Sequence, residues 1–163
     1  MRVVSTVIFA CVFLGAGVIH AQAFDATGTW EGGWTCRVRH NGTPVTFTKE
    51  AIVMKITQRG STVYVDADND KYHYGGWAGA DTENAGRGAV TLVECRTSPT
   101  STAFNEVISA TVKASSRGGK LTGTSAYSFI APSYTDIGGM CKLSFRRTST
   151  ADPGVGPCPP KVD

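Results

Sequence analysis

Leucine and charged residues are both scarce in this chain. Charged residues make up 18% of its 163 positions, against roughly 25% in soluble domains, which argues against a coiled coil or a long solvated helix. After residue 23, leucine occurs three times and threonine nineteen times. Because β-branched side chains suit the pleated surface of a strand and leucine suits a helix, this ratio favours an all-β fold.

Signatures of several functions are also missing. The net charge of +3 is too small for a dedicated nucleic-acid-binding protein. The motifs G-x-S-x-G and H-E-x-x-H and the P-loop are absent, so we expect no enzymatic activity. The acidic run at residues 66–70 is followed by Lys71 and Trp77 where an EF-hand loop needs its Gly and its bidentate Glu. We therefore expect neither a metal site nor a cofactor.

Long apolar runs are confined to the N-terminus. A mostly apolar run at residues 3–18 precedes Ala21-Gln22-Ala23, a small-x-small pattern that signal peptidase cleaves. We therefore expect a periplasmic or secreted product with no membrane association after cleavage. The expected divisions are residues 1–23 as a signal peptide, residues 24–148 as a β-barrel domain and residues 149–163 as a proline-rich tail.

Four cysteines remain after residue 23, namely Cys36, Cys95, Cys141 and Cys158. An even number in an oxidising compartment predicts two disulfides, for which three pairings are possible. No pair has the C-x-x-C spacing, so the cysteines indicate neither a zinc knuckle nor a thioredoxin-like redox site.

Apolar and polar residues alternate with period two along most of the chain, which is typical of half-buried strands. Asn41-Gly42 is the strongest two-residue hairpin signal, and a change of apolar phase near Lys49-Glu50 predicts a bulge. Longer polar loops are expected at Thr97–Ala103 and Ala131–Gly139. The eight predicted strands cover residues 30–39, 45–58, 62–67, 71–77, 88–96, 105–115, 120–130 and 140–147.

Eight strands with mostly short connections predict an eight-stranded antiparallel up-and-down barrel, because short links suit sequential pairing. A two-sheet β-sandwich is the alternative. The interior of an eight-stranded barrel holds packed side chains or one small ligand.

Gly28-Thr29-Trp30 lies at the start of the first predicted strand. It resembles the G-x-W signature of the calycin barrels, which include lipocalins and avidins. In that group the tryptophan closes one barrel end beneath a basic residue of the last strand, and the resemblance assigns these roles to Trp30 and Arg147. The segment Lys120–Thr124 is similar to strand openings of avidins, and residues 28–36 are similar to the start of exported bacterial proteins.

The resemblance implies a fold but no specificity. The T-D-Y motif of lipocalins is missing, and biotin binding is not implied. The resemblance also implies a disulfide pairing. With Trp30 opposite Arg147, Cys36 faces Cys141 across the first and eighth strands, and the remaining two cysteines pair with each other.

Two groups of aromatic residues are the candidate ligand-binding residues. Trp34, Tyr127 and Phe129 occur in or near the inward phase of their strands, where such side chains line apolar cavities. Tyr72, Tyr74 and Trp77 form an aromatic cluster suited to contact with a ligand or a partner loop. Both groups would bind a small apolar ligand in a lipocalin-like barrel. The alternative is a solid barrel that contacts a protein partner through its loops, such as an inhibitor of a secreted hydrolase. An internal cavity would favour the ligand, and a filled interior with a protruding loop would favour the partner. The candidate residues are Trp34, Tyr72, Tyr74, Trp77, Tyr127 and Phe129.

Cleavage after Ala23 can be tested on protein exported by its own host. The exported chain is expected to begin at Phe24, because signal peptidase accepts the small side chains of Ala21 and Ala23. N-terminal sequencing and intact mass measure this directly. An Ala23→Phe variant is expected to stay uncleaved. An exported wild-type product that keeps residues 1–23 would contradict the prediction.

Overall fold

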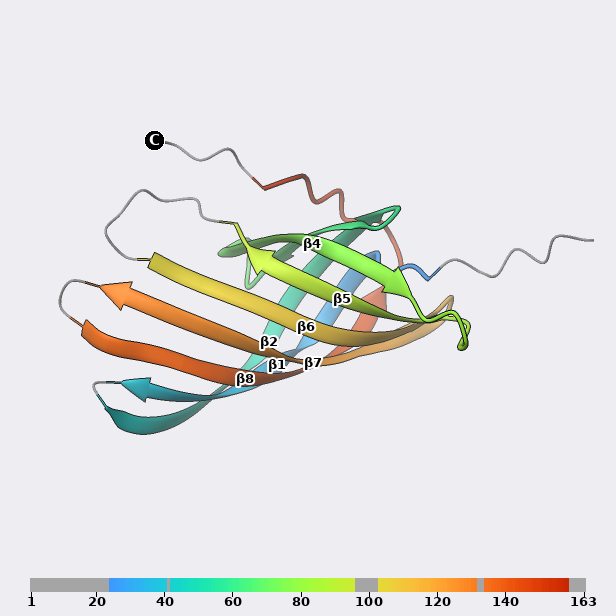
Figure 1. Cartoon of the computed structure of the whole chain (residues 1–163). Coiled ribbons are helices and arrows are strands. Elements are labelled where there is room, and N and C mark those ends of the chain that lie inside the picture. The colour runs from blue at the N-terminus through green and yellow to red at the C-terminus, as the bar shows by residue number, and fades with distance from the viewer. Residues whose placement is uncertain (1–23, 41, 96–102, 132–133, 159–163) are drawn as a thin grey trace, which may run out of the picture.

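The computed structural model describes residues 24–40, 42–95, 103–131 and 134–158. All regular structure in this part of the chain is β-strand, as the sequence predicts, and no described segment forms a helix able to cross a membrane. The strands, labelled in Figure 1, are β1 (Gly28–His40), β2 (Thr43–Arg59), β3 (Thr62–Ala67), β4 (Tyr72–Ala80), β5 (Arg87–Glu94), β6 (Ala103–Ser115), β7 (Gly118–Ala131) and β8 (Tyr134–Ser149).

The strands close into a barrel in which each pairs with its neighbours in sequence and β1 pairs with β8. Every pair is antiparallel, so the architecture is the predicted up-and-down barrel and not the sandwich. The strands β3, β4 and β5 have 6 to 9 residues, whereas the other five have 13 to 17. The barrel therefore has a short wall and a tall wall, and Figure 1 shows β6, β7 and β8 side by side in the tall one.

The seam between β1 and β8 has the register that the calycin resemblance implies. Trp30 lies opposite Arg147, and Cys36 lies opposite Cys141. Residues that face each other on antiparallel strands are close enough for a disulfide. Both expected bridges are present, Cys36–Cys141 and Cys95–Cys158.

The predicted bulge is present in β2. This strand places two residues, Glu50 and Ala51, opposite Gly33 of β1. Ala51 has a positive φ of 55°, and an extra residue of this kind bends a strand and strengthens its twist. The predicted hairpin at residues 41–42 joins β1 to β2, although residue 41 itself lies outside the described part.

The prediction of a loop at Ala131–Gly139 is wrong. Strand β8 begins at Tyr134, so most of this segment is strand and pairs with β7 and β1. Its glycines indicate a loop in the sequence, yet in the fold Gly139 permits close approach of β1. A Cβ atom on Gly139 would lie 2.5 Å from the carbonyl oxygen of Arg37. The other predicted loop falls almost entirely on residues 96–102, outside the described part.

Apolar side chains fill the half of the barrel that contains Trp30, which we call the closed half. They form one continuous cluster contributed by all eight strands, so this half holds packed side chains as the interiors of small barrels do. The sequence left open whether the interior is filled or hollow, and for this half it is filled. The largest fully buried side chains in this half are Trp30, Phe145, Ile52, Met54, Ile56, Leu92, Ile108 and Leu121.

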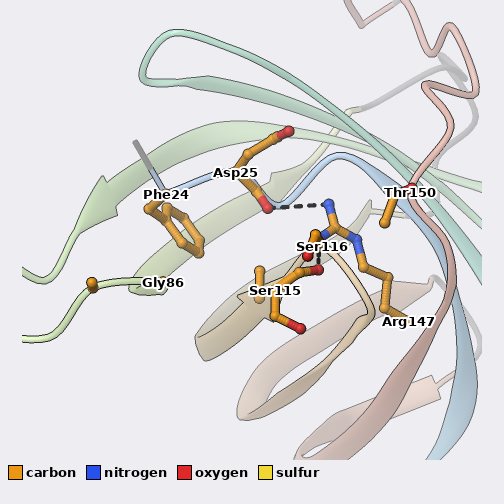
Figure 2. A pocket seen from close by; sticks show the side chains of 9 residues that line it. Phe24, Asp25, Gly86, Ser115, Ser116, Arg147 and Thr150 are labelled. Atoms are coloured by element: carbon orange, nitrogen blue, oxygen red, sulfur yellow. Dashed lines mark hydrogen bonds between the residues drawn. The ribbon is translucent and has the colours of Figure 1, made fainter. Parts of the chain in front are cut away.

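Arg147 covers Trp30 at the closed end, as the resemblance implies. Its guanidinium carbon lies 5.3 Å from the centre of the indole ring, within the range of a cation–π contact. The same guanidinium donates to the carbonyl oxygens of Thr27 and, at 3.1 Å, of Asp25, the second of which is drawn in Figure 2. The indole N–H of Trp30 donates to the Ala26 carbonyl at 3.0 Å. One cation therefore ties β8 to the segment that leads into β1.

The C-terminal tail is fastened to the outside of the barrel. The Thr57 hydroxyl donates to Asp152 at 2.6 Å and accepts from the Val155 N–H at 2.9 Å, and the Val155 side chain is buried. Further along, the sulfur of Cys158 lies over β4, where a Cβ atom on Gly75 would be 3.0 Å from it. The tail therefore covers the outer faces of β2 and β4.

The closure by Arg147 can be tested by replacing it with methionine. Arg147→Met keeps an apolar cover over Trp30 but leaves the carbonyl oxygens of Asp25, Thr27 and Ser115 without their charged donor. The expected cost is about 2–3 kcal/mol of unfolding free energy, measured by urea denaturation. Arg146→Met is the matched control, because Arg146 is exposed and forms no ion pair among the described residues. Equal losses in both variants would contradict the closure.

Candidate functional site

The open end of the barrel holds a layer of aromatic and acidic side chains above the filled core. Each occupies the same alternating phase as the buried residues of its own strand, so each points inward. We call this set the mouth: Trp34 of β1, Tyr72 and Tyr74 of β4, Glu94 of β5, Glu106 of β6 and Tyr127 of β7.

Tyr74 and Glu106 form the buried centre of the mouth. The Tyr74 hydroxyl donates to Oε2 of Glu106 at 2.7 Å, and both side chains are buried. The strand register adds two further groups, because Glu94 lies opposite Tyr74 and Tyr127 lies opposite Glu106. Burying carboxylates costs free energy that apolar side chains would not cost. This layer is therefore the part of the interior that packing alone does not explain.

The environment of Tyr74 and Tyr127 favours their protonated phenols. Burial raises the pKa of Tyr74 well above its ordinary value of 10.0, and the Glu106 carboxylate adds to this shift. Burial also raises the pKa of Tyr127, again with a contribution from Glu106. A protonated phenol is both a hydrogen-bond donor and an acceptor, so these tyrosines offer donors at neutral pH beside a carboxylate that accepts.

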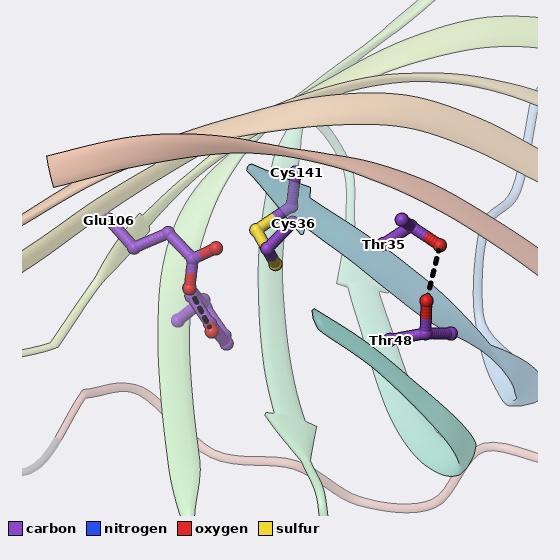
Figure 3. The surroundings of a disulfide bond; sticks show 6 residues. Thr35, Cys36, Thr48, Glu106 and Cys141 are labelled. Atoms are coloured by element: carbon purple, nitrogen blue, oxygen red, sulfur yellow. Dashed lines mark hydrogen bonds between the residues drawn. A yellow bond between two sulfur atoms is a disulfide. The ribbon is translucent and has the colours of Figure 1, made fainter. Parts of the chain in front are cut away.

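The β1–β2 hairpin gives the mouth an apolar side wall. Phe47 lies opposite Cys36 and therefore on the same inner face, yet it is 43% exposed. The Trp34 and Tyr72 rings meet edge to face with centroids 6.3 Å apart. Figure 3 shows the disulfide of this wall near Glu106. The buried part of the wall is Cys36, Val38 and Cys141, with Trp34 and Tyr127 packed against it.

Four of the six predicted ligand-binding residues belong to the mouth: Trp34, Tyr72, Tyr74 and Tyr127. Trp77 does not, because it is 55% exposed on the outer face of β4, where its ring covers Gly79. Residues three apart on a strand face opposite ways, so Trp77 and Tyr74 cannot share a site. Phe129 lies on β7, but its side chain falls outside the described part.

The sequence interpretation missed the two glutamates. Glu94 follows Leu92 at a spacing of two, and Glu106 precedes Ile108 at the same spacing. Both therefore interrupt the apolar phase of a strand with a charge. That interruption is the signal that identifies them, since a charged residue on an inward face is uncommon unless it has a partner.

Among the described residues, hollows also lie away from the centre of the mouth. One beneath the tail, of about 200 Å³, includes His73, whose Nδ1 is 2.5 Å from Oδ1 of Asp66. Among the described residues, no three His, Cys, Asp or Glu side chains gather to hold a metal ion. Another hollow, of about 570 Å³ at the closed end and seen in Figure 2, is lined by Phe24, Asp25, Ala85, Gly86, Ala114, Ser115, Ser116, Arg147 and Thr150.

The architecture is compatible with a calycin barrel. The shared features are the closed ring of eight antiparallel strands and the contact of Arg147 with Trp30. The chain matches no family model, no curated protein and no solved structure. The chemistry of the mouth therefore has to be interpreted from its own residues.

The raised pKa of Tyr74 predicts a loss of stability at high pH. The folded state holds this proton more tightly than the unfolded state, whose pKa is about 10. The stabilisation is therefore complete below pH 10 and falls above it, with a slope of about 1.4 kcal/mol per pH unit from this proton. Denaturant unfolding between pH 8 and about pH 11 measures it. Tyr74→Phe is expected to lose this part of the slope, and an unchanged slope would contradict the assignment.

Proposed function

We propose that this chain is an exported, disulfide-stabilised, calycin-like barrel that binds a small ligand in its mouth and catalyses no reaction. The observation that carries the proposal is the change of side-chain chemistry along the interior. The closed half is filled by an apolar cluster, and the mouth then presents half-buried aromatic rings around the buried Tyr74–Glu106 pair. Aromatic walls around a few convergent polar groups are typical of ligand-binding sites.

The apolar side wall and the acidic centre of the mouth together indicate the chemistry of the ligand. Phe47 and Trp34 offer apolar surface on one side, which suits the apolar body that the sequence predicted. One oxygen of Glu106 accepts from Tyr74, and no described residue donates to the other. A carboxylate beside aromatic rings attracts an organic cation, through ion pairing and through the faces of the rings. The proposed ligand is therefore an amine with an aromatic or aliphatic body.

The disulfides support the proposed location and the rigidity of the site. Two bridges indicate an oxidising environment, in agreement with the N-terminal segment that we interpret as a signal peptide. The Cys36–Cys141 bridge joins β1 to β8 within the side wall of the mouth. A wall that is fixed before binding lowers the entropic cost of holding a ligand.

The alternative function is that of an interaction protein, such as an inhibitor of a secreted hydrolase. The filled closed half favours it, and so does a row of exposed apolar side chains on the outer wall, Val93, Val107 and Met140. Native mass spectrometry of protein purified from its own host separates the two functions. A retained small molecule supports the ligand-binding barrel, whereas a co-purifying protein without a small molecule supports the interaction protein.

The ligand class can be tested with a matched pair of probes, 2-phenylethylamine and 2-phenylethanol. In a Trp77→Phe background, tryptophan fluorescence is expected to report tighter binding of the amine by about tenfold, roughly 1.4 kcal/mol, because its ammonium group pairs with Glu106. Glu106→Gln is expected to abolish the preference. Glu83→Gln is the control, since Glu83 is exposed in the turn before β5.

Each other outcome of this titration has a definite meaning. Equal binding of amine and alcohol would keep the mouth as a ligand site but contradict the cationic ligand. Failure of both probes to change the fluorescence, together with no retained small molecule, would contradict the proposed function. A loss of amine binding in Glu83→Gln as large as in Glu106→Gln would move the site away from the mouth.

A further inference from the structure

The described side chains on the outer wall formed by β5, β6, β7 and β8 carry charge of one sign. The outward side chains described on these strands include cations and no carboxylate. Both glutamates of these strands, Glu94 and Glu106, belong to the mouth and point inward. The outward cations, all exposed, are Arg87, Lys113, Lys120, Lys142 and Arg146.

Four of these cations stand in one line across the strands. Arg87 lies opposite Lys113, Lys113 opposite Lys120, and Lys120 opposite Arg146. We call these four residues the basic row. With strands about 4.8 Å apart, the row spans about 14 Å. Like charges that face each other across strands destabilise a sheet, so the fold gains nothing from this arrangement.

Among the described residues, no direct ion pair neutralises a side chain of the basic row. The acidic residues nearest in the pairing pattern lie at its two ends, with Glu31 opposite Arg146 on β1 and Asp81 hydrogen-bonded to the backbone of Arg87. Other carboxylates lie on the β3–β4 side, where Asp68 and Asp70 already contact lysines. The middle of the row faces solvent.

Hydroxyl groups line the basic row on the side toward the mouth. The next outward positions of β6, β7 and β8 are Thr111, Thr122 and Ser144, which lie opposite one another in the same way. Beyond them come Ser109 and Thr124. These side chains are exposed, and each hydroxyl both donates and accepts hydrogen bonds. A row of cations beside rows of hydroxyls matches a polymer that carries both anionic groups and many hydroxyl groups.

We propose that the basic row binds an anionic polysaccharide that lies across β5, β6, β7 and β8. The cations pair with sulfate, phosphate or carboxylate groups of the polymer, and the hydroxyl rows hydrogen-bond to its sugar rings. A lipid surface fits less well, because the exposed apolar side chains of this wall, such as Val107 and Met140, lie about 20 Å from the row, three steps of two residues along the strands. This site lies at the closed end, so it does not depend on the mouth.

The test uses dextran sulfate, with uncharged dextran of equal length as its control. The wild-type chain is expected to bind dextran sulfate and not dextran, with an affinity that falls as salt rises. Lys113→Glu/Lys120→Glu is expected to weaken binding at least tenfold. Arg37→Glu/Arg39→Glu is the matched control, because it changes the net charge equally at exposed positions of β1 beside the hairpin. It is expected to change the affinity less than twofold.

Three outcomes would overturn the proposal. Equal losses in the two double variants would show attraction by net charge alone. Tighter binding of a single-stranded oligonucleotide or of phosphatidylglycerol vesicles than of dextran sulfate would assign the row to another partner. Unchanged binding by Lys113→Gln/Lys120→Gln, which removes the charge without reversing it, would exclude the row itself. Thermal unfolding of each variant confirms that it is folded, and removing repulsion is expected not to lower the transition temperature of the glutamine variant.

Discussion

The register of β1 against β8 decides what every other part of this barrel can do. Side chains alternate between the two faces of a strand, so a slip of one residue at the seam would turn the interior of β1 outward. Two contacts at separate heights fix this register, the Arg147 cover over Trp30 at the closed end and the Cys36–Cys141 bridge beside the mouth. With both contacts in place, the inward apolar side chains of all eight strands pack into one core.

The same seam explains why much of the fold could be predicted from the sequence. The strand count follows from alternation and turn signals, and a single assumed pair, Trp30 with Arg147, reproduces the observed disulfides. The error at Ala131–Gly139 came from interpreting glycine as a turn signal. Whether a glycine turns the chain or admits a close neighbouring strand depends on the partner strand, which local sequence does not contain.

In the mouth, too, local sequence predicts some features, whereas others depend on strands that are distant in sequence. Its aromatic members could be selected from the sequence, and the spacing of two between Tyr72 and Tyr74 already separates them from Trp77. That Glu106 would meet Tyr74 could not be predicted, because the two side chains are 32 positions apart in sequence and meet across the interior. Polar pairs inside a barrel depend on its closure, which sets the height of every strand relative to the others.

Alternation also lets the same strands carry two unrelated surfaces. In β6, Glu106 and Ile108 point inward, while Ser109, Thr111 and Lys113 point outward. The inward residues are therefore constrained by core packing and by the mouth. The outward residues are free of those constraints, so their charge can be selected independently. A sheet with one buried face usually mixes both signs on its wet face, since opposite charges across strands stabilise and like charges destabilise. Four aligned cations run against that tendency without helping the core, and a constraint from outside the chain accounts for them better than folding does.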